Sequence, residues 1–246
     1  MELECESTKE YLKSYNHEIE LPDIKMCLFE KCYPPKLDSF LIAEELVKIV
    51  KKDDKVLDIG TGSGILAILA AKKGVFAVAT DIHEGSAKCA KYNAFLNNVE
   101  VDALVGNLFE PIKEEKLFDI IVSNMATLPA PPKEQYNEYT TRTVDAGPDG
   151  RKYLDPLINQ IPKYLKEEGV FLTLHSNFAN IEKTKNKLDD LGFGFKVELK
   201  VSEHPTGKTS GQRIDYFLKY LPENCHPIKK EGGWYQKIGI FNARRK

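Results

Sequence analysis

The sequence predicts an α/β protein built on a mostly parallel sheet that is covered by helices on both faces. From residue 55 onward, short apolar runs alternate with helix-forming segments, which is the pattern of parallel strands joined by helices. One apolar run is followed directly by a glycine-rich turn and the start of a helix. The chain has 246 residues with an even 42% hydrophobic content, enough for one substantial core.

The N-terminal part precedes this alternation and is predicted to be helical. Residues 7–16 and 37–51 have helical patterns, and the second segment carries a broad apolar stripe. Between them, Tyr33 and two prolines favour an extended turn, or simply a rigid connector. We therefore expect residues 1–52 to form a helical extension that covers the cofactor, and residues 53–246 to form the main domain, in one compact unit with the extension.

Seven strands and four helices are expected in the main domain. The C-terminal 45 residues break the alternation, with an apolar segment at 214–221 that suits a short helix or a strand. The expected strands are residues 55–59, 75–80, 101–105, 118–123, 169–175, 195–202 and 235–242, and the expected helices are residues 63–73, 84–97, 150–165 and 180–191.

The segment Val56–Ala71, VLDIGTGSGILAILAA, predicts a binding turn for a nucleotide-like cofactor. Glycine permits positive φ and lets a ligand lie against bare backbone, next to the N–H groups of a helix start. A dinucleotide-binding turn would place its third glycine at position 65, where the chain has Ile65. The alternative is an ordinary turn, which three glycines inside a core segment disfavour because they cost stability.

Polar residues that follow the strands are the next candidates, since ligands of open parallel sheets bind beyond the carboxyl ends of the strands. Asp81 closes the second strand and is placed to accept hydrogen bonds from ribose hydroxyls, or to cap the next helix. Asn107 follows the third strand, where a plain turn residue is the alternative. His83 and His175 lie at the same edge; either suits a general base for a hydroxyl acceptor, with a loop or capping role as the simpler alternative.

The pattern Asp58, Gly60, Gly62, Gly64 resembles motif I of class I S-adenosylmethionine-dependent methyltransferases and matches each of its positions. The resemblance implies a Rossmann-like, doubly wound sheet of seven strands and S-adenosyl-L-methionine as the cofactor. It also implies that Asn107 faces the adenine amino group. The cofactor-binding residues expected from the resemblance and from the strand ends are Asp58, Gly60, Thr61, Gly62, Gly64, Asp81, Ile82, Asn107, Leu108, Asn124 and Tyr33.

The fourth strand ends at Asn124, a position at which HemK/PrmC-like glutamine methyltransferases and DNA adenine methyltransferases carry N-P-P-Y. In those enzymes the asparagine side chain and the next carbonyl accept the two hydrogens of a planar amide or amine, and the aromatic ring stacks on the substrate. This chain keeps the asparagine but has Met125, Ala126 and Thr127 in place of the two prolines and the tyrosine. The resemblance implies that Asn124 is the catalytic residue.

Two further segments resemble the HemK/PrmC-like group. Residues 146–154, AGPDGRKYL, resemble the G-G-x-D-G-L segment that follows N-P-P-Y, and residues 33–46, YPPKLDSFLIAEEL, resemble the segment that folds over the cofactor before motif I. The resemblance covers about residues 33–202. It implies methyl transfer to a nitrogen, most simply a side-chain amide of a protein; the alternatives are a small-molecule N- or O-methyltransferase, a nucleic-acid base methyltransferase, or an inactive cofactor-binding subunit.

Composition narrows the partners. Lysine and arginine (35) nearly balance aspartate and glutamate (37), so the charge gives no case for a nucleic-acid partner. Five scattered cysteines without a C-x-x-C pair indicate reduced thiols rather than a disulfide framework, and no cluster indicates a metal site. No apolar run is long enough to span a bilayer, and the N-terminus is charged. We expect a soluble, cytoplasmic protein without a membrane partner, whose acceptor is a protein or a small molecule; its oligomeric state stays open.

Overall fold

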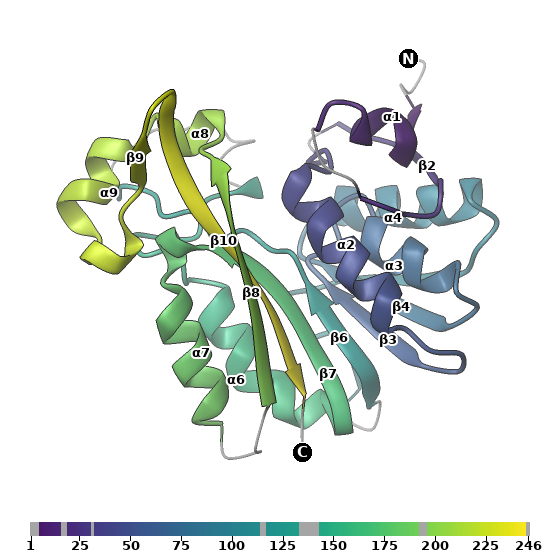
Figure 1. Cartoon of the computed structure of the whole chain (residues 1–246). Coiled ribbons are helices and arrows are strands. Elements are labelled where there is room, and N and C mark those ends of the chain that lie inside the picture. The colour runs from purple at the N-terminus through teal and green to yellow at the C-terminus, as the bar shows by residue number, and fades with distance from the viewer. Residues whose placement is uncertain are drawn as a thin grey trace. The chain divides into compact units, whose positions relative to one another are not determined.

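The computed structural model describes residues 5–15, 19–30, 32–113, 117–132, 143–191 and 196–244 and consists of two compact units (Figure 1). Unit 1 contains the described residues up to Asn124 together with Ile161–Leu172. Unit 2 contains the described residues of Met125–Gln160 and Thr173–Arg244. Helix α6 (Leu154–Tyr164) and strand β7 (Leu165–Ser176) each contribute residues to both units.

Unit 1 is built on parallel strands. Strand β3 (Lys55–Ile59) pairs in parallel with β4 (Phe76–Asp81) on one side and with β6 (Phe118–Ser123) on the other. Strand β5 (Val101–Val105) pairs in parallel with β4, and β7 neighbours β6. Residues Val56 and Leu57 are fully buried, because a central parallel strand is covered on both faces.

Three helices pack beside these strands: α2 (Leu37–Ile49), α3 (Ile65–Ala71) and α4 (Glu84–Leu96) (Figure 1). All seven residues of α3 are buried, as its uniformly apolar sequence requires, and α3 contacts both α2 and α4. Helix α4 ends at Leu96 with Asn97 as its C-cap residue, and Asn98 follows with a positive φ of 52°. These helices confirm the predicted segments 63–73 and 84–97 with shorter ends.

The N-terminal extension contains two strands that the sequence did not predict. Strand β1 (Cys5–Ser7) pairs antiparallel with β2 (Lys25–Cys27), and α1 (Thr8–Leu12) lies between them in the chain. Helix α1 is shorter than the predicted helix over 7–16, and it starts at a capping box formed by Ser7 and Glu10. A three-residue strand has no detectable period, so β1 and β2 depend on their pairing rather than on local sequence.

The cysteine prediction was wrong. The structure joins Cys5 to Cys27 in a disulfide, although the five cysteines gave no sign of one. The two residues face each other across the β1–β2 pair, and that pairing is what brings them together over 22 positions of sequence. The remaining three cysteines, Cys32, Cys89 and Cys225, are free and buried.

Unit 2 contains a long antiparallel pair and a small helical layer. Strand β8 (Lys196–Pro205) pairs with β10 (Gly233–Arg244), and the short β9 (Ile228–Lys230) pairs with the start of β10. Helix α7 (Ile181–Asp189) contacts both β8 and β10. The three-residue turns η1 (Asn177–Ala179) and η2 (Glu223–Cys225) and the helices α8 (Lys208–Gly211) and α9 (Ile214–Tyr220) complete it.

The apolar segment at 214–221 is a helix with its own small core. Phe217 of α9 is fully buried and stacks on Phe178 of η1 with ring centroids 4.4 Å apart. Ile214, Leu221 and Cys225 complete this cluster. The C-terminal region therefore contributes a separate packed layer of unit 2.

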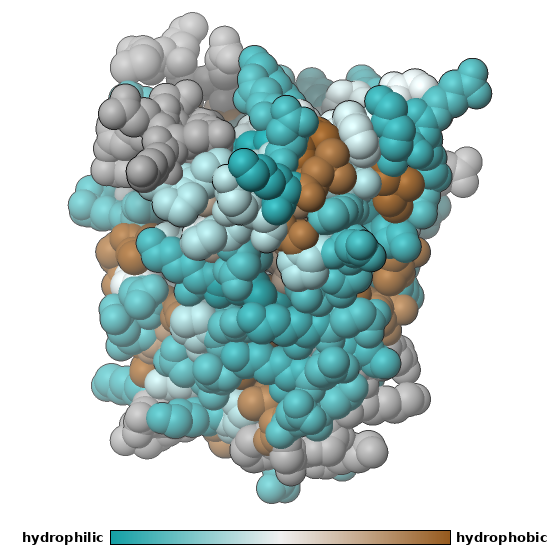
Figure 2. Space-filling view, turned by 90° about the vertical axis from the view of Figure 1, so that its left-hand side faces the viewer, coloured by the Kyte–Doolittle hydropathy of each residue, from teal (hydrophilic) through white to brown (hydrophobic). Residues whose placement is uncertain are grey.

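The predicted fold class is confirmed: a mostly parallel sheet with flanking helices, in which each of the seven expected strands is present and β9 is an addition. Among the described residues, no helix is long and apolar enough to cross a membrane. Hydrophilic residues cover most of the face seen in Figure 2, and hydrophobic residues occur there only in small groups.

Candidate functional site

The turn after β3 requires its glycines for two different reasons. Gly60, Gly62 and Gly64 all have positive φ, of 74°, 55° and 87°. At Gly64 a Cβ would lie 2.8 Å from the Cα of Ala90, so this glycine allows α3 and α4 to pack closely. At Gly62 a Cβ would meet no atom within 4 Å, so the side of the turn at Gly62 is open. An open, bare backbone is what a cofactor needs.

Asp58 lies beneath this turn and is fully buried. Its Oδ2 accepts a hydrogen bond from the Thr61 hydroxyl at 2.6 Å and one from the Ala67 N–H at 3.3 Å. Its Oδ1 is buried and has no hydrogen-bond partner among the described residues. The pKa of the Asp58 carboxyl is raised to about 7, mainly because of burial; the hydrogen bonds from Thr61 and Ala67 act against this rise, and the nearby Asp81 charge adds to it.

Asp81 ends β4 and is tied to the glycine turn. Its Oδ2 accepts the Gly62 N–H at 3.0 Å, and its Oδ1 accepts the His83 N–H at 2.9 Å. Burial raises the pKa of this carboxyl. Because a carboxylate accepts about four hydrogen bonds, Asp81 keeps capacity for hydroxyl donors of a ligand. The next side chain, Ile82, is 55% exposed.

The turn after β5 contains two of the predicted cofactor residues. The exposed Asn107 donates its backbone N–H to the Glu110 carboxylate, and its side-chain amide has no partner among the described residues. Leu108 has a positive φ of 51°, and its carbonyl accepts a hydrogen bond from the Thr80 hydroxyl at 3.0 Å. This bond ties the turn to the end of β4, the strand that carries Asp81.

Asn93 connects the glycine turn to the N-terminal extension, and the sequence did not single it out. Its buried amide nitrogen donates to the Ser63 carbonyl at 2.9 Å and to the Cys27 carbonyl at 3.1 Å, while its oxygen accepts the Cys27 N–H at 2.8 Å. Asn97, one helical turn later, bonds Lys25 in the same way. A pair of asparagines four positions apart on α4 is the only sequence signal.

Asn124 directly follows β6 and is partly exposed. Its amide nitrogen donates to the Ser39 hydroxyl at 3.1 Å and to the Asp38 carboxylate at 3.4 Å, both at the start of α2. Next to it, the Ser123 hydroxyl donates to the Ile59 carbonyl, which fixes the end of β6 against the end of β3. Asp38 and Ser39 were not predicted as site residues, although they lie in the segment that resembles a cofactor cover.

Tyr33 begins that covering segment and is partly buried. The Lys36 ammonium lies 4.7 Å from the centroid of its ring. Burial and the Asp38 charge raise the pKa of the Tyr33 phenol, so it stays protonated at neutral pH. Its contact with a cofactor stays a prediction.

In unit 2, the residues that replace Pro-Pro-Tyr belong to a segment that is firmly held. Leu128 bridges to Asp145 in parallel, and a Cβ on Gly150 would collide with the Thr127 carbonyl. The buried Arg213 forms an ion pair with Asp145 at 2.7 Å and donates to the Pro129 carbonyl at 3.1 Å. Arg213 lies 84 positions from Pro129, which is why the sequence did not reveal it. Residues 133–142 of the expected substrate loop lie outside the described residues.

The two candidate histidines occupy positions at which they support the fold. His175 is buried, with Nδ1 bonded to the Ser176 carbonyl and Nε2 to the Thr184 hydroxyl, and burial lowers its pKa to about 4. The buried Arg151 also binds Thr184, so His175 belongs to a packed polar cluster of unit 2. His83 is the N-cap residue of α4. These positions favour the loop and capping alternative over a general base.

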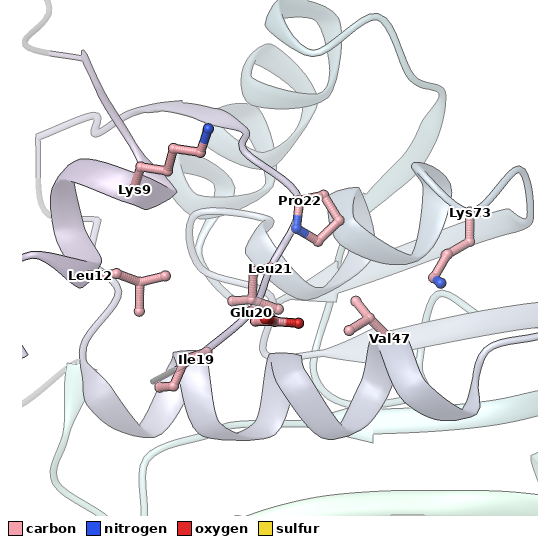
Figure 3. Close-up of a pocket in the computed structure, with 8 residues that line it drawn as sticks. All are labelled: Lys9, Leu12, Ile19, Glu20, Leu21, Pro22, Val47 and Lys73. Carbon is pink, nitrogen blue, oxygen red and sulfur yellow. The ribbon is translucent and has the colours of Figure 1, made fainter. Parts of the chain in front are cut away.

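A cavity of about 460 Å³ in unit 1 lies away from these residues, between α1, residues 19–22 and α2 (Figure 3). It is lined by Lys9, Leu12, Ile19, Glu20, Leu21, Pro22, Val47 and Lys73, none of which is a predicted site residue. In the part of the chain that the structure describes, no group of three or more metal-ligating side chains occurs.

The chain is similar in sequence to known methyltransferases. The chain is 41% identical over 182 residues to a Methanocaldococcus jannaschii protein provisionally named protein N5-glutamine methyltransferase. The matched region covers 74% of this chain and 89% of that relative. It is 32% identical over 142 residues to the release factor glutamine methyltransferase of Geobacter sulfurreducens, covering 55% of this chain and half of that enzyme. The family model of ribosomal protein L11 methyltransferase (PrmA) matches residues 40–130.

Solved structures of low identity share the fold. The Mtq2–Trm112 complex of E. cuniculi, described as methylating the translation termination factor eRF1, matches 88% of this chain with a TM-score of 0.57 and 15% identity, over 99% of that chain. The T. thermophilus 16S rRNA methyltransferase RsmC, solved with AdoMet and guanosine, matches the whole chain over 52% of its own length, with a TM-score of 0.59 and 17% identity.

Proposed function

Because the chain belongs to the class I S-adenosylmethionine-dependent methyltransferases, in the HemK/PrmC-like glutamine methyltransferase family, we propose that it methylates the side-chain amide nitrogen of a glutamine in a protein. The observation that carries this proposal is the arrangement of Asn124. Its amide nitrogen is bound to α2, while its oxygen has no partner among the described residues, and the residue as a whole is only partly buried. A free amide oxygen at this position is an acceptor for an N–H of the substrate.

The cofactor half of the site fits S-adenosyl-L-methionine. Within the described part of the chain, the buried Oδ1 of Asp58 has no hydrogen-bond donor, the backbone at Gly62 is open, and Asp81 retains acceptor capacity for ribose hydroxyls. We assign cofactor binding to these residues together with Gly60, Thr61 and Gly64. When bound, the cofactor supplies a methyl group that is already activated on a sulfonium.

The main contribution of the chain's own residues is to position the acceptor nitrogen relative to the methyl group. In-line transfer requires that the acceptor nitrogen, the methyl carbon and the sulfur be collinear, and such orientation is worth up to about 7 to 11 kcal/mol. An amide nitrogen is a weak nucleophile, since its lone pair is delocalised into the carbonyl. A hydrogen bond from the amide N–H to Asn124 Oδ1 fixes the orientation of the amide and strengthens as the nitrogen acquires positive charge.

The acceptor half departs from the family pattern at Met125, Ala126 and Thr127. The chain has no stacking ring at this position, and its rigidity comes instead from the pairing of Leu128 with Asp145 and from Arg213. A nitrogen of ribosomal protein L11 is the second candidate acceptor, because the PrmA family model matches the chain. That match covers residues 40–130, which carry all of the predicted cofactor residues except Tyr33 and only the beginning of the acceptor segment, so it favours the shared cofactor site more than a shared acceptor.

The acceptor is tested by offering the purified chain labelled S-adenosyl-L-methionine with a translation release factor, ribosomal protein L11 or a small-molecule extract. We expect label in the release factor, located on a glutamine side chain by fragmentation mass spectrometry. Label confined to L11 would favour the second candidate. Label confined to small molecules, or to an oxygen, would contradict the proposed function.

A further inference from the structure

The start of α2 holds the side chain of Asn124 in one orientation. The Ser39 hydroxyl and the Asp38 Oδ2 both accept from the same amide nitrogen, at 3.1 and 3.4 Å. The Ser39 hydroxyl also accepts the Lys36 backbone N–H. Two residues in the first turn of α2 therefore bind the side-chain amide of Asn124, which lies 85 and 86 positions further along the chain.

Only one of these two contacts distinguishes the ends of the amide. A hydroxyl both donates and accepts, so Ser39 would bind either the nitrogen or the oxygen of Asn124. An ionised carboxylate only accepts, so Asp38 binds the nitrogen and repels the oxygen. The amide of an asparagine is nearly symmetric in shape, and its orientation is therefore set by hydrogen-bond partners of this kind.

We propose that Asp38 is a positioning residue for methyl transfer: it turns the Asn124 amide so that Oδ1 faces the acceptor nitrogen. This inference deepens the proposed function and rests on it. With Asp38 bound to the amide nitrogen, Oδ1 has no partner among the described residues, and Asn124 is only partly buried. Without the carboxylate, the amide would adopt both orientations, and in one of them an NH2 group would face the N–H donors of the acceptor.

The surroundings of Asp38 support an acceptor role. Burial raises the pKa of its carboxyl overall, while the Ser39 backbone N–H, the Asn124 amide and the Lys36 charge oppose this rise and favour the ionised form. The side chain lies in the first turn of a 13-residue helix, where the helix dipole favours a negative charge. The Asp38 charge in turn raises the pKa of the Tyr33 and Tyr15 phenols, which remain neutral and add no competing anion.

The test compares Asp38→Asn with Glu44→Gln, which makes the same carboxylate-to-amide change on a surface residue of α2 that pairs with Lys48. For each variant, kcat and KM are measured with the unmethylated form of the acceptor protein, and the Kd for S-adenosylhomocysteine is measured by calorimetry. We expect Asp38→Asn to lower kcat at least about tenfold with Kd changed less than twofold, and Glu44→Gln to change neither. Asp38→Glu, which keeps the carboxylate, should recover part of kcat.

A double variant separates this inference from the proposed function. In an Asn124→Ala background, Asp38→Asn should have no further effect on kcat, because its effect passes through Asn124. Additive losses, an unchanged kcat, or a weakened Kd that accounts for the loss would each overturn the positioning role. If Asp38→Asn unfolds the chain, the comparison of Asp38→Glu in the two backgrounds gives the same answer. An acceptor other than glutamine would contradict the proposed function while leaving this coupling measurable on whichever acceptor is methylated.

Discussion

At the scale of single residues, Asp58 has the most unfavourable electrostatic surroundings in the cofactor half of the site. One carboxylate oxygen is bound by Thr61 and Ala67, and the other is buried without a partner. Burial is the main cause of the raised pKa of about 7, compared with 3.8 for the free side chain. The folded chain therefore binds this proton more tightly than the unfolded chain does.

The sign of the pH dependence follows from that difference. Between about pH 4 and pH 7 the folded state retains a proton that the unfolded state has lost, so Asp58 lowers the free energy of unfolding as the pH rises through this window. We expect Asp58→Asn to remove this loss and to exceed the wild type in stability at pH 8 by up to about 4 kcal/mol, measured by urea unfolding. Asp102→Asn, at an exposed carboxylate of β5, is the control and should change little. Equal unfolding free energies of wild type and Asp58→Asn at pH 8 would show that the ionised Asp58 carboxylate does not destabilise the folded state. Weaker binding of S-adenosylhomocysteine by the variant would support its cofactor role.

The residues of the site differ in how far sequence reveals them. The glycine turn, Asp81 and Asn124 follow strands at fixed spacings, so a local pattern identifies them. Asp38, Ser39 and Arg213 act through partners more than 80 positions away, and no local pattern carries that information. Asn107 and Ile82 are exposed, and their contacts with a cofactor stay predictions.

At the scale of elements, the glycine turn combines close packing of α3 on α4 with an open face for a ligand. The two properties belong to different glycines: Gly64 faces the backbone of Ala90, and Gly62 faces open space. Gly74 has a similar positive φ of 80° and also faces open space, but it lies at the far end of α3. Substitutions at these three glycines therefore distinguish three effects: the cost of a positive φ at Gly74, a steric collision at Gly64, and blocked access of a ligand at Gly62.

Alanine substitutions at these glycines should have three distinct outcomes. Gly74→Ala pays only the cost of a positive φ, about 1 kcal/mol or somewhat more. Gly64→Ala adds a collision with Ala90 and should lose at least about 2 kcal/mol beyond that value in denaturant unfolding. Gly62→Ala should resemble Gly74→Ala in stability and yet bind S-adenosylhomocysteine at least about tenfold more weakly. Equal affinity of Gly62→Ala and wild type would mean that the cofactor does not lie against this backbone.

Elements with a clear period or a continuous apolar run were predictable, and the others were not. The central strands β3, β4 and β6 are apolar runs because both of their faces are covered. Strands β1, β2 and β9 have three residues each, too few to show a period. They exist through pairing: β1 pairs with β2, 22 positions away at Cys5 and Cys27, and β9 pairs with the start of β10, which follows it in the chain. The Cys5–Cys27 disulfide follows from the β1–β2 pairing and was missed for the same reason.

At the scale of the whole molecule, the predicted cofactor residues and the segment that replaces Pro-Pro-Tyr belong to different units. Unit 1 holds the glycine turn, Asp58, Asp81 and Asn124, whereas the segment that replaces Pro-Pro-Tyr begins unit 2. The PrmA family model matches residues 40–130, which cover part of unit 1 and the first residues of unit 2. The division of the chain at residue 52 into an extension and a main domain stays a prediction.

The central claim is that Asn124 acts on the acceptor amide rather than on the cofactor. The most direct test is the Asn124→Ala variant, measured in parallel by calorimetry with S-adenosylhomocysteine and by methyl transfer to a glutamine-containing release factor. We expect the Kd to stay within about twofold of wild type, while kcat falls at least about 100-fold, the loss that follows removal of one preorganised hydrogen-bonding group. Undiminished transfer by Asn124→Ala, or a loss of transfer explained by lost cofactor binding, would contradict the account.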